Sequence, residues 1–249
     1  ELVLTNGEDK RTGIQVFAPH NHKLDTFEDV WDVWMMYMRE LLDVANKINN
    51  IQMDVWRKIN MPVVASMLKP DCFKKGQHIG NEGARYNGGI NFESCGTVNF
   101  INSMASLKKN VYDDKKYTLE EMTDAILHNG VYSPDRREAT DEAPKYEKIF
   151  FDCVNAPKYG NADPYADSIL KDYEDRMLPE MLRLRSYYGK QYYMCQISVS
   201  THGPQGAITL ATPDGRLAGT TYADGSMSPA PTTDKNGIYA VFESATCYD

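Results

Sequence analysis

Two neighbouring stretches decide how the chain folds: Ala211-Thr212-Pro213-Asp214-Gly215-Arg216 and Ala223-Asp224-Gly225-Ser226. Both combine Asp with Gly, and the first adds Pro. Because Pro fixes φ and Gly tolerates positive φ, each stretch is expected to reverse the chain between packed elements. Turn chemistry names no function by itself, so the meaning of these loops comes from the sequence around them.

The composition is that of a globular protein. The chain has 249 residues, of which 42% are hydrophobic and 25% charged, enough for one large domain or two small ones. A net charge of -8 and the absence of a long Lys or Arg run argue against a nucleic-acid partner. Because the sequence has neither an apolar run of about 18 residues nor a signal-peptide pattern at its start, we expect a cytoplasmic protein without a membrane partner.

The cysteines and histidines indicate no disulfide framework and no metal site. The cysteines are odd in number, widely spaced and without a C-x-x-C pair, so reduced thiols are expected. His20 and His22 offer two metal ligands, but no third stands at a recognised spacing. The five cysteines are Cys72, Cys95, Cys153, Cys195 and Cys247.

Apolar residues recurring every three or four positions predict several helices. The longest runs from Thr26 to about Asn60, with its apolar face in the core, and Thr118-Leu119-Glu120-Glu121 is a capping box that starts another, closed by Gly130. Further helices are expected from Val63 to Lys69 or restarting past Pro70 to end near Gly76, from Val98 to Leu107, and from Pro164 to about Tyr188, where Pro179 would kink or divide the helix.

Three apolar runs predict strands: residues 149–151, 192–200 and 238–242. Residues 131–147 are polar and contain two prolines, so they are expected to form a surface excursion. Strands that alternate with helices indicate an α/β fold, with one domain or part of one as the simplest organisation.

Glu93 is the residue whose setting suggests chemistry. It lies in Ile90-Asn91-Phe92-Glu93-Ser94-Cys95-Gly96, where apolar neighbours predict burial. A buried carboxylate is paired or has a raised pKa, which suits a site acid or base. The alternative is a Glu that caps a helix beginning near Gly96, and the residues alone leave the two interpretations about even.

A series of landmarks then resembles the glycyl radical enzyme family, the pyruvate formate-lyase-like proteins. The resemblance implies that residues 1–249 form part of a ten-stranded α/β barrel, helix-rich, in which a cysteine radical regenerated from a glycyl radical attacks the substrate. The family's Gly-Cys-x-Glu loop is expected before residue 1 and its glycyl loop after residue 249, so the chain alone is expected to be inactive. The landmarks are residues 70–76, 83–87, 99–109, 155–161 and 211–226.

Within the family, residues 93–99, 223–228 and 233–239 most resemble the arylacetate decarboxylases. This resemblance implies decarboxylation of 4-hydroxyphenylacetate to p-cresol and carbon dioxide, with Glu93 as the catalytic group that accepts the phenolic proton. Ile197 and Val199 would bind the substrate by packing against its aromatic ring, or else belong to the ordinary barrel core.

The resemblance also implies cofactors and partners. The chain itself would bind no cofactor; the glycyl radical of the full-length protein would be installed by an S-adenosylmethionine iron–sulfur activating enzyme. A small aromatic carboxylate substrate, a small iron–sulfur subunit and a homo-oligomer are expected. Two alternatives stay open: another glycyl radical enzyme, such as an arylalkylsuccinate synthase or a dehydratase, and a noncatalytic helical binding module built on the aromatic, Met-rich helix 26–60.

Overall fold

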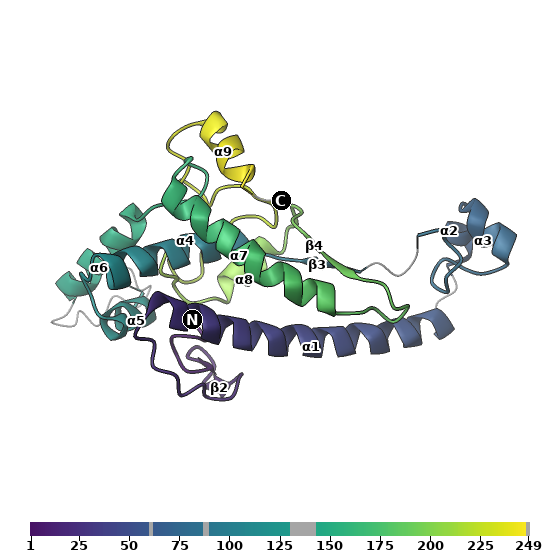
Figure 1. The fold of residues 1–249 in the computed structure, drawn as a ribbon, viewed down its shortest axis with the longest axis horizontal. Helices are drawn as coiled ribbons and strands as arrows, with labels where there is room; N and C mark the ends of the chain where they lie inside the picture. Colours follow the sequence, from purple (N-terminus) through teal and green to yellow (C-terminus); the bar gives the residue numbers. More distant parts are fainter. Residues whose placement is uncertain (60–61, 87–89, 130–142, 248–249) are drawn as a thin grey trace. The chain divides into compact units, whose positions relative to one another are not determined.

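The computed structural model describes residues 1–59, 62–86, 90–129 and 143–247, and helices dominate them (Figure 1). Strands β1 (Glu8–Asp9) and β2 (Ile14–Gln15) form an antiparallel pair, with Glu8 opposite Gln15. Strands β3 (Ile90–Glu93) and β4 (Tyr192–Cys195) are neighbours in a second sheet. The helices are α1 (Phe27–Ile59), α2 (Val63–Met67), α3 (Pro70–Lys75), α4 (Thr97–Leu107) with the π-helical extension η1 (Lys108–Asp113), α5 (Leu119–Leu127), α6 (Ala143–Asn155), α7 (Pro164–Arg183), α8 (His202–Ala207) and α9 (Ile238–Ala245).

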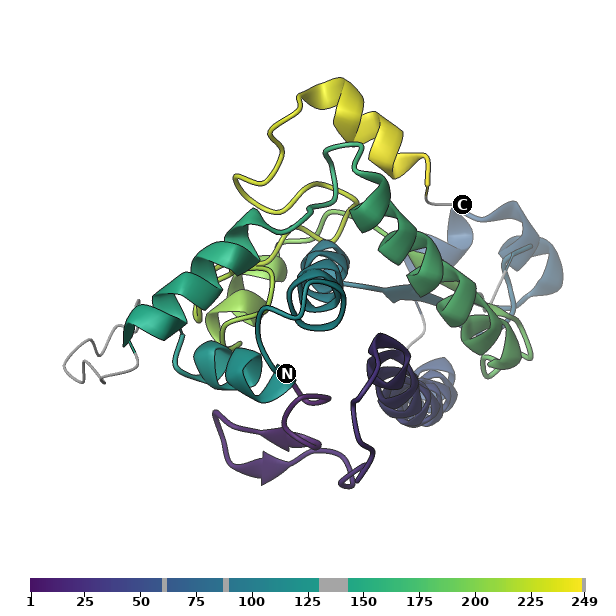
Figure 2. The same cartoon turned by 60° about the vertical axis from the view of Figure 1, so that its left-hand side comes forward.

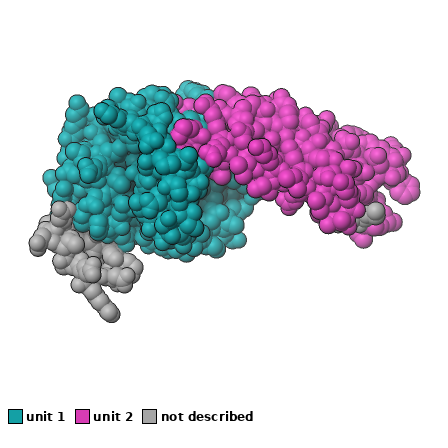
Figure 3. All heavy atoms as spheres, turned by 90° about the horizontal axis from the view of Figure 1, so that it is seen from below, with its two compact units in different colours: residues 1–35, 93–175, 196–249 teal, residues 36–92, 176–195 magenta. Residues whose placement is uncertain are grey.

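The chain divides into two compact units, which Figure 3 shows in different colours. Unit 1 comprises Glu1–Met35, Glu93–Asp175 and Gln196–Asp249, and unit 2 comprises Met36–Phe92 and Arg176–Cys195. Within the described residues, no helix is both long enough and apolar enough to cross a membrane.

Helix α4 forms the centre of unit 1. Its residues from Thr97 to Leu107 are buried except Phe100, and Figure 2 shows the helix nearly end-on in the middle of the unit. Phe100 stacks on Trp34 at a centroid distance of 4.5 Å, and Trp31 meets Phe100 edge-on at 5.6 Å. Such offset and edge-to-face contacts stabilise aromatic cores. Unit 1 is therefore built around a buried helix that carries several polar side chains.

Unit 2 is joined by ion pairs and hydrogen bonds between segments distant in sequence. Arg39 Nε donates to Glu180 Oε1 at 2.6 Å, and Arg183 Nη1 donates to Asp43 Oδ1 at 2.6 Å, so the middle of α1 is tied to the end of α7. The Tyr188 hydroxyl donates to the Gly80 carbonyl at 2.6 Å. These contacts hold the two sequence segments of unit 2 together.

Several predicted helices are confirmed. Helix α1 spans nearly the predicted range, and Thr118 and Glu121 make the reciprocal hydrogen bonds of a capping box. The region from Val63 holds two short helices, of which α3 ends at Gly76 with a left-handed φ of 63°. The predicted closing residue Gly130 and most of the expected surface excursion lie outside the described residues.

Other predictions are wrong. Residues 149–151 belong to α6 and residues 238–242 to α9, so neither is a strand. In α6 the buried residues Tyr146, Ile149 and Cys153 stand three and four apart, a helical spacing that the short window 149–151 conceals. The surface excursion also gives way to α6 at Ala143.

The remaining corrections concern boundaries and burial. Strand β4 ends at Cys195 rather than at Ser200, and α7 continues through Pro179 as one helix that ends at Arg183. The predicted core face of α1 is only partly buried: Trp31 is fully buried, whereas the side chain of Ile48 is 59% exposed.

Candidate functional site

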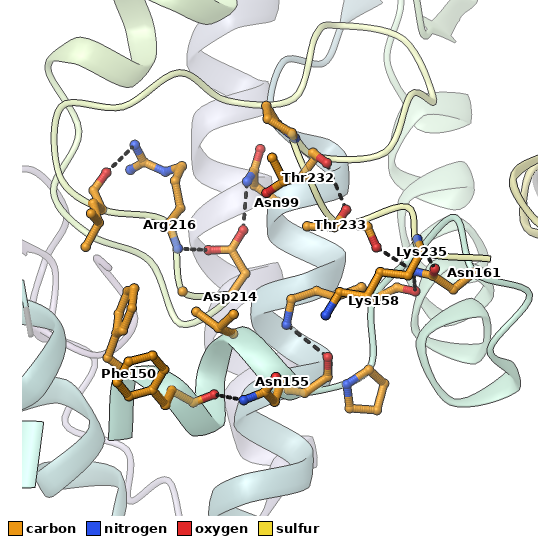
Figure 4. Close-up of a pocket in the computed structure, with 18 of the residues that line it drawn as sticks. Asn99, Phe150, Asn155, Lys158, Asn161, Asp214, Arg216, Thr232, Thr233 and Lys235 are labelled. Atoms are coloured by element: carbon orange, nitrogen blue, oxygen red, sulfur yellow. Dashed lines mark hydrogen bonds between the residues drawn. The ribbon is translucent and has the colours of Figure 1, made fainter. Parts of the chain in front are cut away.

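The two turn loops, residues 211–216 and residues 223–226, are joined by one amide of α4. Asn99 Nδ2 donates to Asp214 Oδ2 at 2.7 Å, and Asn99 Oδ1 accepts from the backbone N–H of Ala223 at 2.7 Å. Asn99 is buried, so both ends of its amide are satisfied away from water (Figure 4). The first loop and the second loop are therefore held on the same buried helix.

Asp214 organises the first loop from within. Its carboxylate also accepts from the Thr212 hydroxyl and, at 3.1 Å, from the backbone N–H of Arg216. Gly215 has a φ of +86°, and a Cβ there would lie 2.6 Å from Cγ2 of Val154. Glycine is required both by the left-handed backbone and by the close approach of α6.

Arg216 stabilises the backbone between the two loops. Its guanidinium donates to the carbonyls of Thr220 at 2.7 Å and Leu217 at 3.2 Å, and lies 4.6 Å from the Tyr222 ring centroid. Burial lowers the pKa of Arg216 below its usual value. Arg216 Nε also donates to the Thr212 hydroxyl at 3.2 Å, and with its other hydrogen bonds directed at backbone carbonyls Arg216 acts as a structural cation.

A cavity of about 810 Å³ lies beside this cluster, lined by Asn99, Lys158, Asp214 and Arg216 among others (Figure 4). Lys158 is buried, and its ammonium donates to the carbonyls of Cys153 at 2.6 Å and Ala156 at 3.0 Å. Burial lowers the pKa of Lys158 to about 8, while the charge of Asp214 opposes this change. The lysine thereby closes the C-terminal end of α6.

Glu93 stands at the end of β3 with an exposed side chain, so the expected burial is wrong for this chain. The capping interpretation gains no support either, because the N-cap of α4 is Gly96, with a φ of 80°, and no side chain caps the helix. The neighbouring Ser94 hydroxyl is 2.6 Å from the Thr97 hydroxyl. Glu93 therefore projects from an ordered strand-to-helix connection.

Ile197 and Val199 lie on the irregular segment after β4. Gln196 Nε2 donates to Thr97 Oγ1 at 3.3 Å, which brings this segment beside the connection that carries Glu93. Val199 is half-buried, and the side chain of Ile197 is 39% exposed. The structure therefore brings together the two segments that carry the three predicted site residues, and Val199 alone of the three is half-buried.

The same segment packs on the second loop. Ser198 Oγ donates to Asp224 Oδ2 at 3.2 Å, and the Ile197 carbonyl and Val199 side chain approach Gly225 closely. Although burial acts to raise it, hydrogen bonds from Ser226, Ser198 and Ser228 lower the pKa of Asp224 below its usual value.

Cys95, between Glu93 and α4, is a packed thiol as expected. Burial raises the pKa of its thiol, and the hydroxyl of Thr201 opposes this change. A raised pKa disfavours the reactive thiolate. Among the described residues, no three His, Cys, Asp or Glu side chains are grouped to hold a metal ion.

Sequence reasoning missed the polar cluster around α4. Asn99, Lys158, Asp214 and Arg216 all occur in the quoted landmarks, yet their contacts join segments 115 residues apart in the case of Asn99 and Asp214. The sequence signal that could have indicated this cluster is the occurrence of charged residues next to Pro and Gly in tightly turning loops.

Comparisons with known proteins agree with the resemblance. The family model described as "Pyruvate formate lyase-like" matches residues 1–206. The whole chain is 66% identical to the 4-hydroxyphenylacetate decarboxylase glycyl radical subunit of Clostridium scatologenes, and 35% identical to the indoleacetate decarboxylase of Tractidigestivibacter scatoligenes. In both cases the chain spans 29% of the length of the relative.

A solved structure shows the same fold. The enzyme of 1,2-propanediol dehydration in Roseburia inulinivorans matches with a TM-score of 0.89 and 26% identity, over 100% of this chain and 30% of that one. The α/β, helix-rich architecture is thus that of a part of the glycyl radical enzyme barrel, as predicted. The chain belongs to the pyruvate formate-lyase-like family of glycyl radical enzymes.

Proposed function

We propose that this chain supplies substrate-pocket and scaffold parts of a glycyl radical enzyme that decarboxylates 4-hydroxyphenylacetate to p-cresol and carbon dioxide. The observation that carries the proposal is the 66% identity, over the whole chain, to the glycyl radical subunit of a 4-hydroxyphenylacetate decarboxylase. A second relative that acts on an arylacetate, at 35% identity, supports the substrate class.

In this proposal Glu93 accepts the phenolic proton of the substrate. The radical of the whole enzyme supplies a one-electron oxidant. Removing an electron from the phenol is easier when its proton leaves at the same time, so a positioned carboxylate lowers the barrier. Loss of carbon dioxide from the oxidised, deprotonated substrate then leaves a radical anion, which takes back the proton from Glu93 and gains one hydrogen atom to become p-cresol.

Exposure of Glu93 fits this role. Its side chain projects from an ordered connection between β3 and α4, and the side chain of Ile197 is also exposed in that region. We propose that these side chains line the substrate pocket of the whole enzyme, Glu93 at the hydroxyl and Ile197 and Val199 along the ring. Apolar contacts with Ile197 and Val199 would orient the ring, while Glu93 would fix the position of its hydroxyl group.

The partners follow from the same proposal. The relative is called a glycyl radical subunit, a name that implies a further subunit in that enzyme. For this protein we propose a small iron–sulfur subunit, a homo-oligomer, and an S-adenosylmethionine iron–sulfur enzyme that installs the radical. A cytoplasmic location stays a prediction.

The alternatives have weaker support. A dehydratase or an arylalkylsuccinate synthase would share the fold, but the similarity to the enzyme of propanediol dehydration is 26% in sequence. A noncatalytic binding module is disfavoured by the match to a family of enzymes.

The Glu93→Gln substitution tests the proton-acceptor role in the full-length enzyme. Glutamine keeps the size of the side chain but cannot take the proton, so p-cresol formation is expected to fall at least about 100-fold. The glycyl radical, measured by electron paramagnetic resonance, is expected to form at the wild-type level. Glu40→Gln, on the exposed surface of α1, is the matched control and should leave both unchanged. Near-normal turnover by the Glu93 variant would remove this residue from the mechanism.

A further inference from the structure

Gly225 packs closely against the segment after β4. A Cβ at Gly225 would lie well inside 3.0 Å of the Ile197 carbonyl oxygen and 2.9 Å from Cγ2 of Val199. The backbone of Gly225 needs no left-handed φ, since it is not among the residues with positive φ. Space alone therefore excludes a side chain at this position.

The second loop that carries Gly225 is itself rigidly held. Asn99 anchors it through the backbone N–H of Ala223 at 2.7 Å, and Asp224 accepts from the backbone N–H of Ser226 at 2.9 Å. Asp224 also accepts a hydrogen bond from the Ser198 hydroxyl at 3.2 Å. Residues 197–199 belong to no helix or strand, so we expect an overlap at Gly225 to displace them rather than the loop anchored on α4.

We infer that Gly225 is a positioning residue that sets the width of the substrate pocket beside Ile197. This inference rests on the proposed function, in which Ile197 and Val199 contact the aromatic ring. The overlap at Gly225 falls on the Ile197 carbonyl and the Val199 side chain, so a bulkier residue there pushes residues 197–199, and with them the exposed Ile197 side chain, away from the second loop. The second loop thereby limits the size of the ring that the pocket accepts.

The expected displacement is large enough to matter. Relieving the overlap moves the Ile197 backbone by about 1 Å, a misplacement that can change rates about 100-fold when it reaches a reacting centre. A larger substrate ring would also press against Ile197. One methyl group more or less in an apolar pocket changes affinity by about 10-fold or more.

The test compares two ligands in the full-length enzyme before the radical is installed. Calorimetry gives the dissociation constants of 4-hydroxyphenylacetate and of an analogue with one added ring methyl group. In Gly225→Ala the ratio of the analogue's constant to that of the parent is expected to rise about 10-fold. Ser198→Ala, which removes the hydrogen bond to Asp224, should change the ratio by a smaller factor without a steric push. It keeps the test valid if the glycine variant fails to fold.

Gly203→Ala is the matched control. A Cβ there meets nothing within 4 Å and its φ is not positive, so the ratio should stay at the wild-type value. Equal weakening of both ligands in Gly225→Ala would indicate a merely structural role and overturn the inference, as would an unchanged ratio in both variants. If the wild-type enzyme neither binds 4-hydroxyphenylacetate nor releases carbon dioxide from it, the proposed function fails instead.

Discussion

At the scale of single residues, Asn99 is the side chain on which the two loops depend. Its amide donates to a carboxylate and accepts from a backbone N–H, and both partners are buried. Asn99→Ala leaves Asp214 Oδ2 and the Ala223 N–H without these partners. Unmet buried groups of this kind cost about 1–3 kcal/mol each, so we expect a loss of stability of about 2–4 kcal/mol, measured by thermal unfolding of the full-length enzyme.

Asn155→Ala is the control for that substitution. Asn155 is exposed and makes a hydrogen bond to the Phe151 carbonyl at 2.8 Å at the end of α6, so its loss should change stability by no more than about 0.5 kcal/mol. Equal unfolding temperatures for the two variants would show that Asn99 does not hold the loops.

Lys158 predicts a pH dependence of stability. Its folded pKa is lowered to about 8 from an ordinary value of 10.5, so between these values the unfolded chain binds a proton that the folded chain does not. Stability from this group therefore rises as pH increases through that window. Relative to Lys158→Met, the wild-type unfolding temperature is expected to rise from about pH 8 to about pH 10.

The difference between wild type and Lys158→Met isolates this lysine from other groups that titrate in the same range. Below about pH 8 both states carry the proton and the difference should be constant. Lys47→Met, which removes an exposed lysine of α1, provides the control for loss of surface charge. A difference that stays flat up to about pH 10 would contradict the burial effect.

At the scale of elements, helices with complete local signals were predictable. The capping box at Thr118 and the glycine stop at Gly76 are encoded within a few residues, and both occur in the structure. Residues 238–242 were wrongly predicted as a strand because a short run of large apolar side chains is typical of strands. In the structure the side chain of Tyr239 is 86% exposed, while Ala240 and Ser244, four residues apart, form the buried side of α9.

The site was predictable in parts. Glu93 came from its local setting, and its role, like Ile197 and Val199, came from a family resemblance; the structure brings their segments together through Gln196 and Thr97. Local sequence could not show that Asn99 meets Ala223, because that contact spans 124 residues and is created by packing. It also could not show the close approach at Gly225, which depends on where two irregular segments cross.

At the scale of the whole molecule, the chain carries an apolar stripe on the later part of α1, within unit 2. Six side chains at helical spacing are each at least 46% exposed, up to 76% for Ile59. Contiguous apolar surface of this kind marks an interaction site or an association hazard. The stripe consists of Leu41, Val44, Ile48, Ile51, Val55 and Ile59.

The stripe predicts that the 249-residue chain, prepared alone, self-associates through α1. Ile51→Glu places a charge in the middle of the stripe and should lower the average mass seen by sedimentation, because burying an unpaired carboxylate opposes association. Asn49→Glu introduces the same side chain and the same change of charge two residues earlier, about 200° around the helix from Ile51, and should leave the mass distribution unchanged. If both variants associate as the wild type does, the contact lies elsewhere; if both dissociate, net charge rather than the stripe controls association.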